Sequence, residues 1–131
     1  MLVDSFAAKA LAALCPPDHE YKLALYTKPL GAKTKYYTTD AEWKGAGYES
    51  GGRKIPGYEI KGAALKFGDV EWLNSDISAR CGLIYDATTG EAVKIMDFGR
   101  TIGVMGGVFT VKMPKKGVVV LEHETVQGEE E

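Results

Sequence analysis

Apolar and polar residues alternate along much of the chain, and this period of two predicts β-strands. The alternation is clearest in the middle of the chain, where one predicted face carries Ile77, Ala79, Cys81 and Leu83. Two stretches rich in turn formers, Leu73–Asp76 and Asp86–Gly90, separate strand-like runs at Leu65–Trp72, Ile77–Tyr85 and Ala92–Phe98. The sequence therefore predicts a three-strand meander at the centre of the domain.

Further runs and loops complete the predicted domain. The remaining strand-like runs are Tyr21–Thr27, Tyr58–Leu65 with a break at Gly62, Val108–Met113 and Val118–Glu122. Lys28–Ala46 predicts a long loop, Gly45–Gly57 predicts tight turns with positive φ, and Gly99–Gly107 predicts another loop. About seven strands at this spacing predict a mainly β fold, an antiparallel β-sandwich or jelly-roll-like domain.

One short helix is predicted before the first strand, from about residue 4 to residue 15. Residues 7–14 are nearly all strong helix formers, and Pro16 and Pro17 end the helix because they lack amide donors. An apolar stripe suited to docking is formed by Val3, Phe6, Ala10, Leu11 and Leu14. We expect residues 1–126 to form a single domain and residues 127–131 to be a disordered acidic tail.

Composition and charge narrow the expected partners. The chain has 131 residues, of which 45% are hydrophobic and 26% charged, which suits one ordinary domain with its own core. A net charge of -2 gives no electrostatic basis for binding nucleic acid or an anionic membrane, so neither is expected as a partner. We predict no secretory signal or membrane span, and buried free thiols at Cys15 and Cys81.

Several motifs could suggest chemistry, but each lacks the residues that the chemistry needs. Asp97–Gly99 spells the DFG motif of protein kinases without the other kinase motifs, and the glycines of Gly103–Gly107 lack the lysine and helix of a phosphate loop. The only histidines, His19 and His123, are predicted to be solvated, and Cys81 to be inert packing. Three carboxylates near Trp72 are predicted as turn and edge residues: Asp69, Glu71 and Asp76. No catalytic, metal or cofactor site is predicted, and the protein is expected not to be an enzyme.

Aromatic residues crowd one loop-rich third of the chain. This composition is typical of contact surfaces, because aromatic rings bury a large area at low cost in entropy. The alternative is that these rings cap the open end of the β-sandwich, and the sequence leaves both interpretations open. The residues are Tyr36, Tyr37, Trp43, Tyr48 and Tyr58.

Several segments, taken in order, resemble a family of small β-rich virion proteins of tailed bacteriophages. They are YKLALYT, YYTTDAEWKGAGYESGGRKI, LKFGDVEWLNSDISARCGLIYD, AVKIMDFG, GVFTVKMP and VVVLE, and together they span about Tyr21 to Leu121. A GxGYxxGG element is present as Gly45, Gly47, Tyr48, Gly51 and Gly52. The chain departs from the family in having Cys81 where a small residue is common, and in its N-terminal helix.

The resemblance implies a structural component of the virion, a capsid decoration or cement protein. It would bind the major capsid protein, form a homo-oligomer on the particle, and lie on the capsid surface after synthesis in the host cytoplasm. The predicted contacts are the aromatic loop residues Tyr36, Tyr37, Trp43, Tyr48 and Tyr58, and the helix residues Phe6 and Leu14. One alternative is a tail, head-tail connector or fibre-associated protein. Another is a carbohydrate-binding domain that uses Trp43 and Trp72 as a sugar platform.

Overall fold

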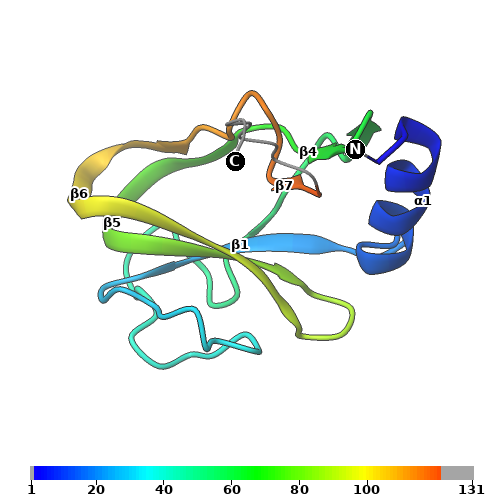
Figure 1. Cartoon of the computed structure of the whole chain (residues 1–131). Coiled ribbons are helices and arrows are strands. Elements are labelled where there is room, and N and C mark those ends of the chain that lie inside the picture. The colour runs from blue at the N-terminus through cyan, green and yellow to red at the C-terminus, as the bar shows by residue number, and fades with distance from the viewer. Residues whose placement is uncertain (1, 122–131) are drawn as a thin grey trace.

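The computed structural model describes residues 2–121 and has a mainly β fold with one helix, as the sequence predicts (Figure 1). One antiparallel sheet has the strand order β2-β1-β5-β6, and a smaller one has the order β3-β4-β7. The predicted tail at residues 127–131 lies outside the described residues. The elements are α1 (Asp4–Leu14), β1 (Tyr21–Tyr26), β2 (Arg53–Lys54), β3 (Glu59–Lys61), β4 (Ala64–Lys66), β5 (Val70–Asp86), β6 (Ala92–Val111) and β7 (Val119–Val120).

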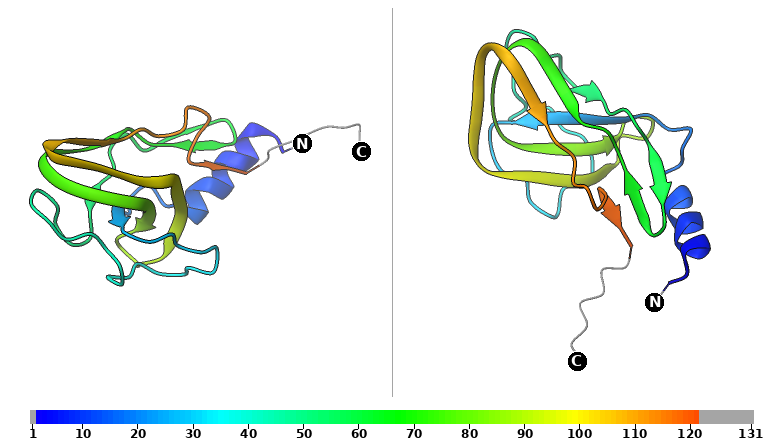
Figure 2. Two further views of the ribbon diagram at one scale, coloured as in Figure 1. Left: turned by 90° about the vertical axis from the view of Figure 1, so that its left-hand side faces the viewer. Right: turned by 90° about the horizontal axis from the view of Figure 1, so that it is seen from above.

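The predicted three-strand meander is wrong, because β5 and β6 form one long curled ribbon (Figure 2). Residues 73–76 are a bulged part of the 17-residue strand β5, in which Asn74 takes a φ of 47°. The predicted loop at residues 99–107 is likewise part of the 20-residue strand β6, with Gly99 at φ 79° and Gly106 at φ 61°. Left-handed residues let a strand bend without ending, so turn formers here mark bulges.

A second bulge changes which face of β5 meets the main core. The pairing moves from Ala79 opposite Ile102 to Cys81 opposite Asp97, so β6 carries extra residues at this point. Ile77 and Ala79 belong to the main core, whereas Cys81 and Leu83 pack in a second cluster on the other face. The predicted single face for these four residues is therefore wrong, because the alternation does not continue through a bulge.

The four-stranded sheet is covered on both faces. The smaller sheet lies over one face, with α1 packed beside it at one end of the molecule, and the main core between the layers is centred on Leu23, Leu65 and Trp72 (Figure 1). The long segment between β1 and β2 lies over the opposite face and covers a cluster containing Tyr26 and Tyr85. This segment, residues 27–52, is called the long loop below.

The helix packs through only part of its predicted apolar stripe. Leu11 is the residue of the stripe that is fully buried, together with Ala7, which was not part of the prediction, and the helix contacts β3 and β4. Phe6 and Leu14 instead remain exposed. Gly62, at φ 61°, turns the chain between β3 and β4, so the predicted run Tyr58–Leu65 forms a hairpin.

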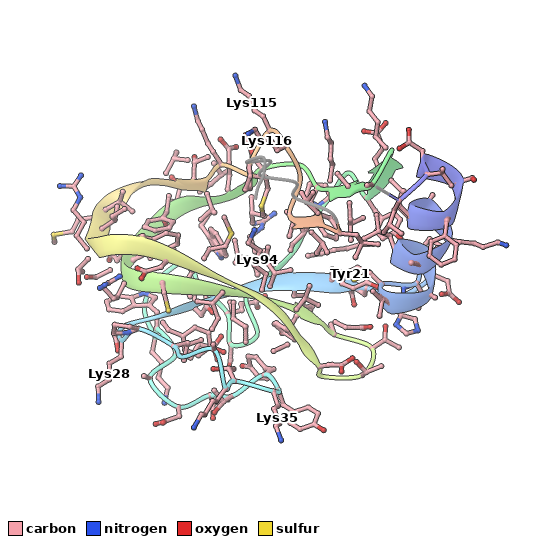
Figure 3. The ribbon with its side chains drawn as sticks, viewed as in Figure 1. Tyr21, Lys28, Lys35, Lys94, Lys115 and Lys116 are labelled. Carbon is pink, nitrogen blue, oxygen red and sulfur yellow. The ribbon has the colours of Figure 1, made fainter. Side chains whose placement is uncertain are left out.

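Several lysine side chains point away from the molecule, whereas one lysine connects β6 to the segment that leads into the smaller sheet. Lys28 and Lys35 on the long loop point away from the sheet, as does Lys115 on the opposite side of the molecule (Figure 3). Lys94 of β6 instead donates a hydrogen bond from Nζ to the carbonyl oxygen of Val118, 2.8 Å away, and so ties β6 to the smaller sheet.

Candidate partner-binding site

The long loop is held to the sheet by one buried carboxylate, that of Glu42, which is 6% exposed. Oε1 accepts hydrogen bonds from the hydroxyls of Tyr37 at 2.5 Å and Ser50 at 3.2 Å. Oε2 accepts from the Tyr48 hydroxyl and from the Gly51 amide, the latter at 2.8 Å. A buried carboxylate is tolerated when its lone pairs are satisfied in this way, and the bonds fix the loop at several points along its length.

Tyr48 belongs to the core. Its side chain is 8% exposed, its ring lies 6.0 Å from that of Trp72, and its hydroxyl also accepts a hydrogen bond from the Leu25 amide of β1. Burial raises the pKa of Tyr48 well above its ordinary value, and the hydrogen bond to Glu42 raises the pKa further. The hydroxyl therefore stays protonated, and the residue is not available as a surface contact.

Other tyrosines tie the long loop to the sheet in the same way. Tyr37 is half-buried and stacks on Tyr85 with ring centroids 4.7 Å apart. The Tyr85 hydroxyl donates to the carbonyl of Gly51, and the Tyr26 hydroxyl donates to the carbonyl of Thr38. The loop is long, but these bonds and stacked rings make it a fixed surface layer.

Tyr36 is the most exposed aromatic residue of the long loop, and Trp43 is partly accessible. Tyr36 is 65% exposed. Trp43 is half-buried, and its Nε1 donates to the carbonyl of Asp76 at 2.8 Å. The Trp43 ring also lines a mostly apolar groove of about 580 Å³ beside Val104 and Met105 at the bend of the ribbon.

Tyr58 lies apart from these residues, at the end of α1. Its hydroxyl donates to the carbonyl of Cys15, and its ring stacks against Tyr21, with a centroid distance of 6.0 Å. The ring also lines a cavity of about 710 Å³, together with Arg53 and Glu71. The five predicted aromatic contacts therefore do not form one surface.

Two of the predicted helix contacts are exposed together with a neighbour. The exposed fractions of Val3, Phe6 and Leu14 are 65%, 57% and 66%. Phe6 and Leu14 belong to α1, and Val3 is its N-cap residue. Exposed apolar residues grouped on one element are typical of a contact surface.

The groups considered for catalysis are each bound by structural partners. His19 Nδ1 lies 2.5 Å from Asp86 Oδ2, while His123 lies outside the described residues. The Cys81 thiol donates to the carbonyl of Lys28, and burial raises its pKa, which disfavours the nucleophilic thiolate. Asp97 of the DFG motif pairs with Arg80, and this bond lowers the pKa of the Asp97 carboxyl.

The three carboxylates near Trp72 accept separate hydrogen bonds. Asp69 accepts from the Met113 amide, Asp76 from the Gly106 amide and Glu71 from the Thr110 hydroxyl. In the described part of the chain, no three His, Cys, Asp or Glu side chains are grouped to hold a metal ion. Trp72 itself is 1% exposed, so it cannot serve as the predicted sugar platform.

Comparison with known proteins finds no match. No family model, no curated protein and no solved structure matches the chain. Within residues 2–121, no helix is long and apolar enough to cross a membrane.

Sequence reasoning missed Glu42, which organises the long loop. An acid in a polar loop is ordinarily solvated, and the one available signal was its place among several tyrosines and a tryptophan. Tyrosine hydroxyls can satisfy a buried carboxylate, so this composition is compatible with a buried acid but does not specify one.

Proposed function

We propose that this chain is a non-enzymatic structural protein of a phage virion, a capsid decoration or cement protein that binds the major capsid protein. The proposal rests first on the resemblance described above. A small β-rich domain whose surface loop is held by hydrogen bonds suits a protein that must keep its shape while attached to a capsid.

The observation that carries the proposal is the exposed apolar surface formed by α1 and its N-cap residue Val3. Val3, Phe6 and Leu14 are all more than half exposed, although the same short helix buries Ala7 and Leu11 completely. Burying a large apolar side chain is worth about 1.5–3 kcal/mol, so a partner that covered this face would gain appreciable binding energy. We therefore assign the helix face as the principal capsid contact.

The long loop supplies a second contact in this proposal. Tyr36 is its most exposed aromatic residue, and Trp43 lies beside an apolar groove. Because the Glu42 network holds the loop in place, little entropy would be lost when a partner binds it. Tyr48 contributes indirectly, by holding Glu42 and β1 together.

The experiment is a binding assay with capsids that lack the protein. Purified wild type should co-sediment with the capsids, and the double variant F6S/L14S should bind at least about tenfold more weakly. The matched control is K9S, which changes an exposed residue of the same helix without removing apolar surface. Circular dichroism should show that both variants are folded, since all three positions are exposed.

Unchanged capsid binding by F6S/L14S would remove the helix face from the proposal. Failure of the wild type to bind capsids, combined with binding to purified tails, would favour the tail, connector or fibre alternative.

A further inference from the structure

The outer edge of β6 is open over much of its length. β6 is the last strand of the larger sheet, and only β5 pairs with it. Within the described residues, no backbone–backbone hydrogen bond formed outside the sheets involves residues 93–111. The Gly106 amide and the Gly107 carbonyl bond to side chains of β5, those of Asp76 and Ser75. Near its start β6 is tied to the smaller sheet through Lys94, but at the bend it lies on the outside of the ribbon (Figure 2).

The open part of this edge lacks the features that usually prevent strands from pairing. From Thr101 to Thr110 the sequence is TIGVMGGVFT, with no charged residue and no proline. Lysine, proline and inward-pointing charges are the common protections of an exposed edge strand. Met105 is 91% exposed and Val108 is 50% exposed, so apolar side chains accompany the open backbone.

β6 bends at Gly106, and this bend changes which residues of the strand face the core. Before it, Ile102 and Val104 lie opposite the core residues Ala79 and Ile77. After it, Phe109 lies opposite Trp72 and is itself buried. The core-facing positions are therefore even-numbered before the bend and odd-numbered after it. Gly106, at φ 61°, lies at this change.

We propose that this edge pairs with the same edge of a second copy of the chain, antiparallel, about a two-fold axis between Met105 and Gly106. In this register Ile102 lies opposite Phe109 of the second copy, so core-facing residues meet core-facing residues on both sides of the bend. A slip by one residue would place core-facing residues opposite solvent-facing ones.

The shape and charge of the edge both favour a second copy over an unrelated strand. A two-fold axis perpendicular to the sheet carries the bend onto itself, so the two curved edges follow each other, whereas a straight strand would diverge from the bend. Thr101 lies opposite Thr110 of the second copy, and the nearest charges, Arg100 and Lys112, lie opposite Val111 and Gly99. No charged residue faces another across the pairing.

The test measures the oligomeric state of the full chain and needs no capsid, so its result is separate from that of the proposed function. Sedimentation velocity of the wild type should show a species of twice the 14.2 kDa chain mass, with a fraction that rises with concentration. The variant T101K/T110K should weaken this dimer by about tenfold or more, because lysines would face each other twice across the pairing. The variant T101E/T110K should restore it, since it places opposite charges at the same positions.

A disulfide tests the register directly. Under mild oxidation T101C/T110C should form a covalent dimer, whereas T101C alone should not, because residue 101 faces residue 110 and not its own counterpart. Both positions are exposed, and a thermal melt checks that the variants fold. A wild type that stays monomeric up to about 1 mM would overturn the proposal. So would a dimer unaffected by T101K/T110K, or one that T101C/T110C does not cross-link.

Discussion

Replacing Glu42 with alanine should loosen the long loop and destabilise the whole domain. The substitution removes the acceptor for four hydrogen bonds, from Tyr37, Tyr48, Ser50 and Gly51. The bonds from Tyr48 and Gly51 are buried, so the hydroxyl and the amide would lose their acceptor where water has little access.

The expected loss follows from these two buried donors. Each donor left unsatisfied costs about 1–3 kcal/mol, and this is partly offset because the variant no longer buries a charge. We expect the free energy of unfolding to fall by about 3 kcal/mol. For 131 residues the entropy of unfolding is about 0.28 kcal/mol/K, so the Tm should fall by roughly 10 °C.

Urea unfolding followed by circular dichroism measures this change, with Glu49→Ala as the matched control. Glu49 is an exposed acid in the same loop, and its replacement should change stability by less than about 0.5 kcal/mol. Glu42→Gln should lie between the two, because its amide nitrogen cannot accept the bonds that one carboxylate oxygen accepts. If the Glu42→Ala variant were as stable as Glu49→Ala, Glu42 would not be the residue that holds the long loop to the sheet.

Three further outcomes are expected. Because the pKa of Tyr48 is raised in the folded state, the free energy of unfolding should be constant below about pH 10 and fall above it, as the unfolded chain releases protons. Urea unfolding at several pH values measures this, and a free energy of unfolding that stays constant to pH 11 would contradict it. Cys15 and Cys81 are buried with raised pKa values, so a thiol reagent should label them only after denaturation, and rapid labelling of the native protein would count against their burial. Gly52 has φ +78°, and a Cβ at this position would lie 1.8 Å from a carbonyl oxygen of β1, so Gly52→Ala should prevent folding. Gly90 has a similar φ of +84° but open space around it, so Gly90→Ala should lower the free energy of unfolding by only about 1 kcal/mol, as measured in a thermal melt. Equal melts for the two glycine variants would show that the approach to β1 is not tight.

Sequence reasoning succeeded where local chemistry decides the structure. The helix was predicted at about residues 4–15 and is found at Asp4–Leu14, ended by the two prolines that follow it. The turn at Asp86–Gly90 between two strands was predicted from its turn-forming residues, among them an aspartate and a glycine. In the structure Asp86 accepts a hydrogen bond from the Thr88 amide, and Gly90 has φ 84°.

Sequence reasoning failed where one sequence signal is compatible with two local structures. Asn74 and Gly99 are turn formers, but in β5 and β6 they adopt left-handed backbone within continuous strands. A left-handed residue can reverse a chain or bulge a strand, and the choice depends on whether the partner strand continues alongside. That partner is distant in sequence, so local pattern cannot reveal it.

The candidate site was predicted by residue type and not by position. Phe6, Leu14 and Tyr36 are exposed, and their role as contacts stays a prediction. Tyr48 is instead buried and donates a hydrogen bond to Glu42, and Tyr58 packs at the end of α1. A tyrosine suits a surface contact and a buried hydrogen bond equally well, so only the tertiary fold separates the two uses.

Cryo-electron microscopy of purified virions tests the central claim most directly, because it locates and counts the protein. The account predicts copies spread over the whole shell at positions set by the capsid lattice, with α1 facing the major capsid protein. A single ring at one vertex, or a stack of copies along the tail, would contradict it and assign the protein to the connector or tail.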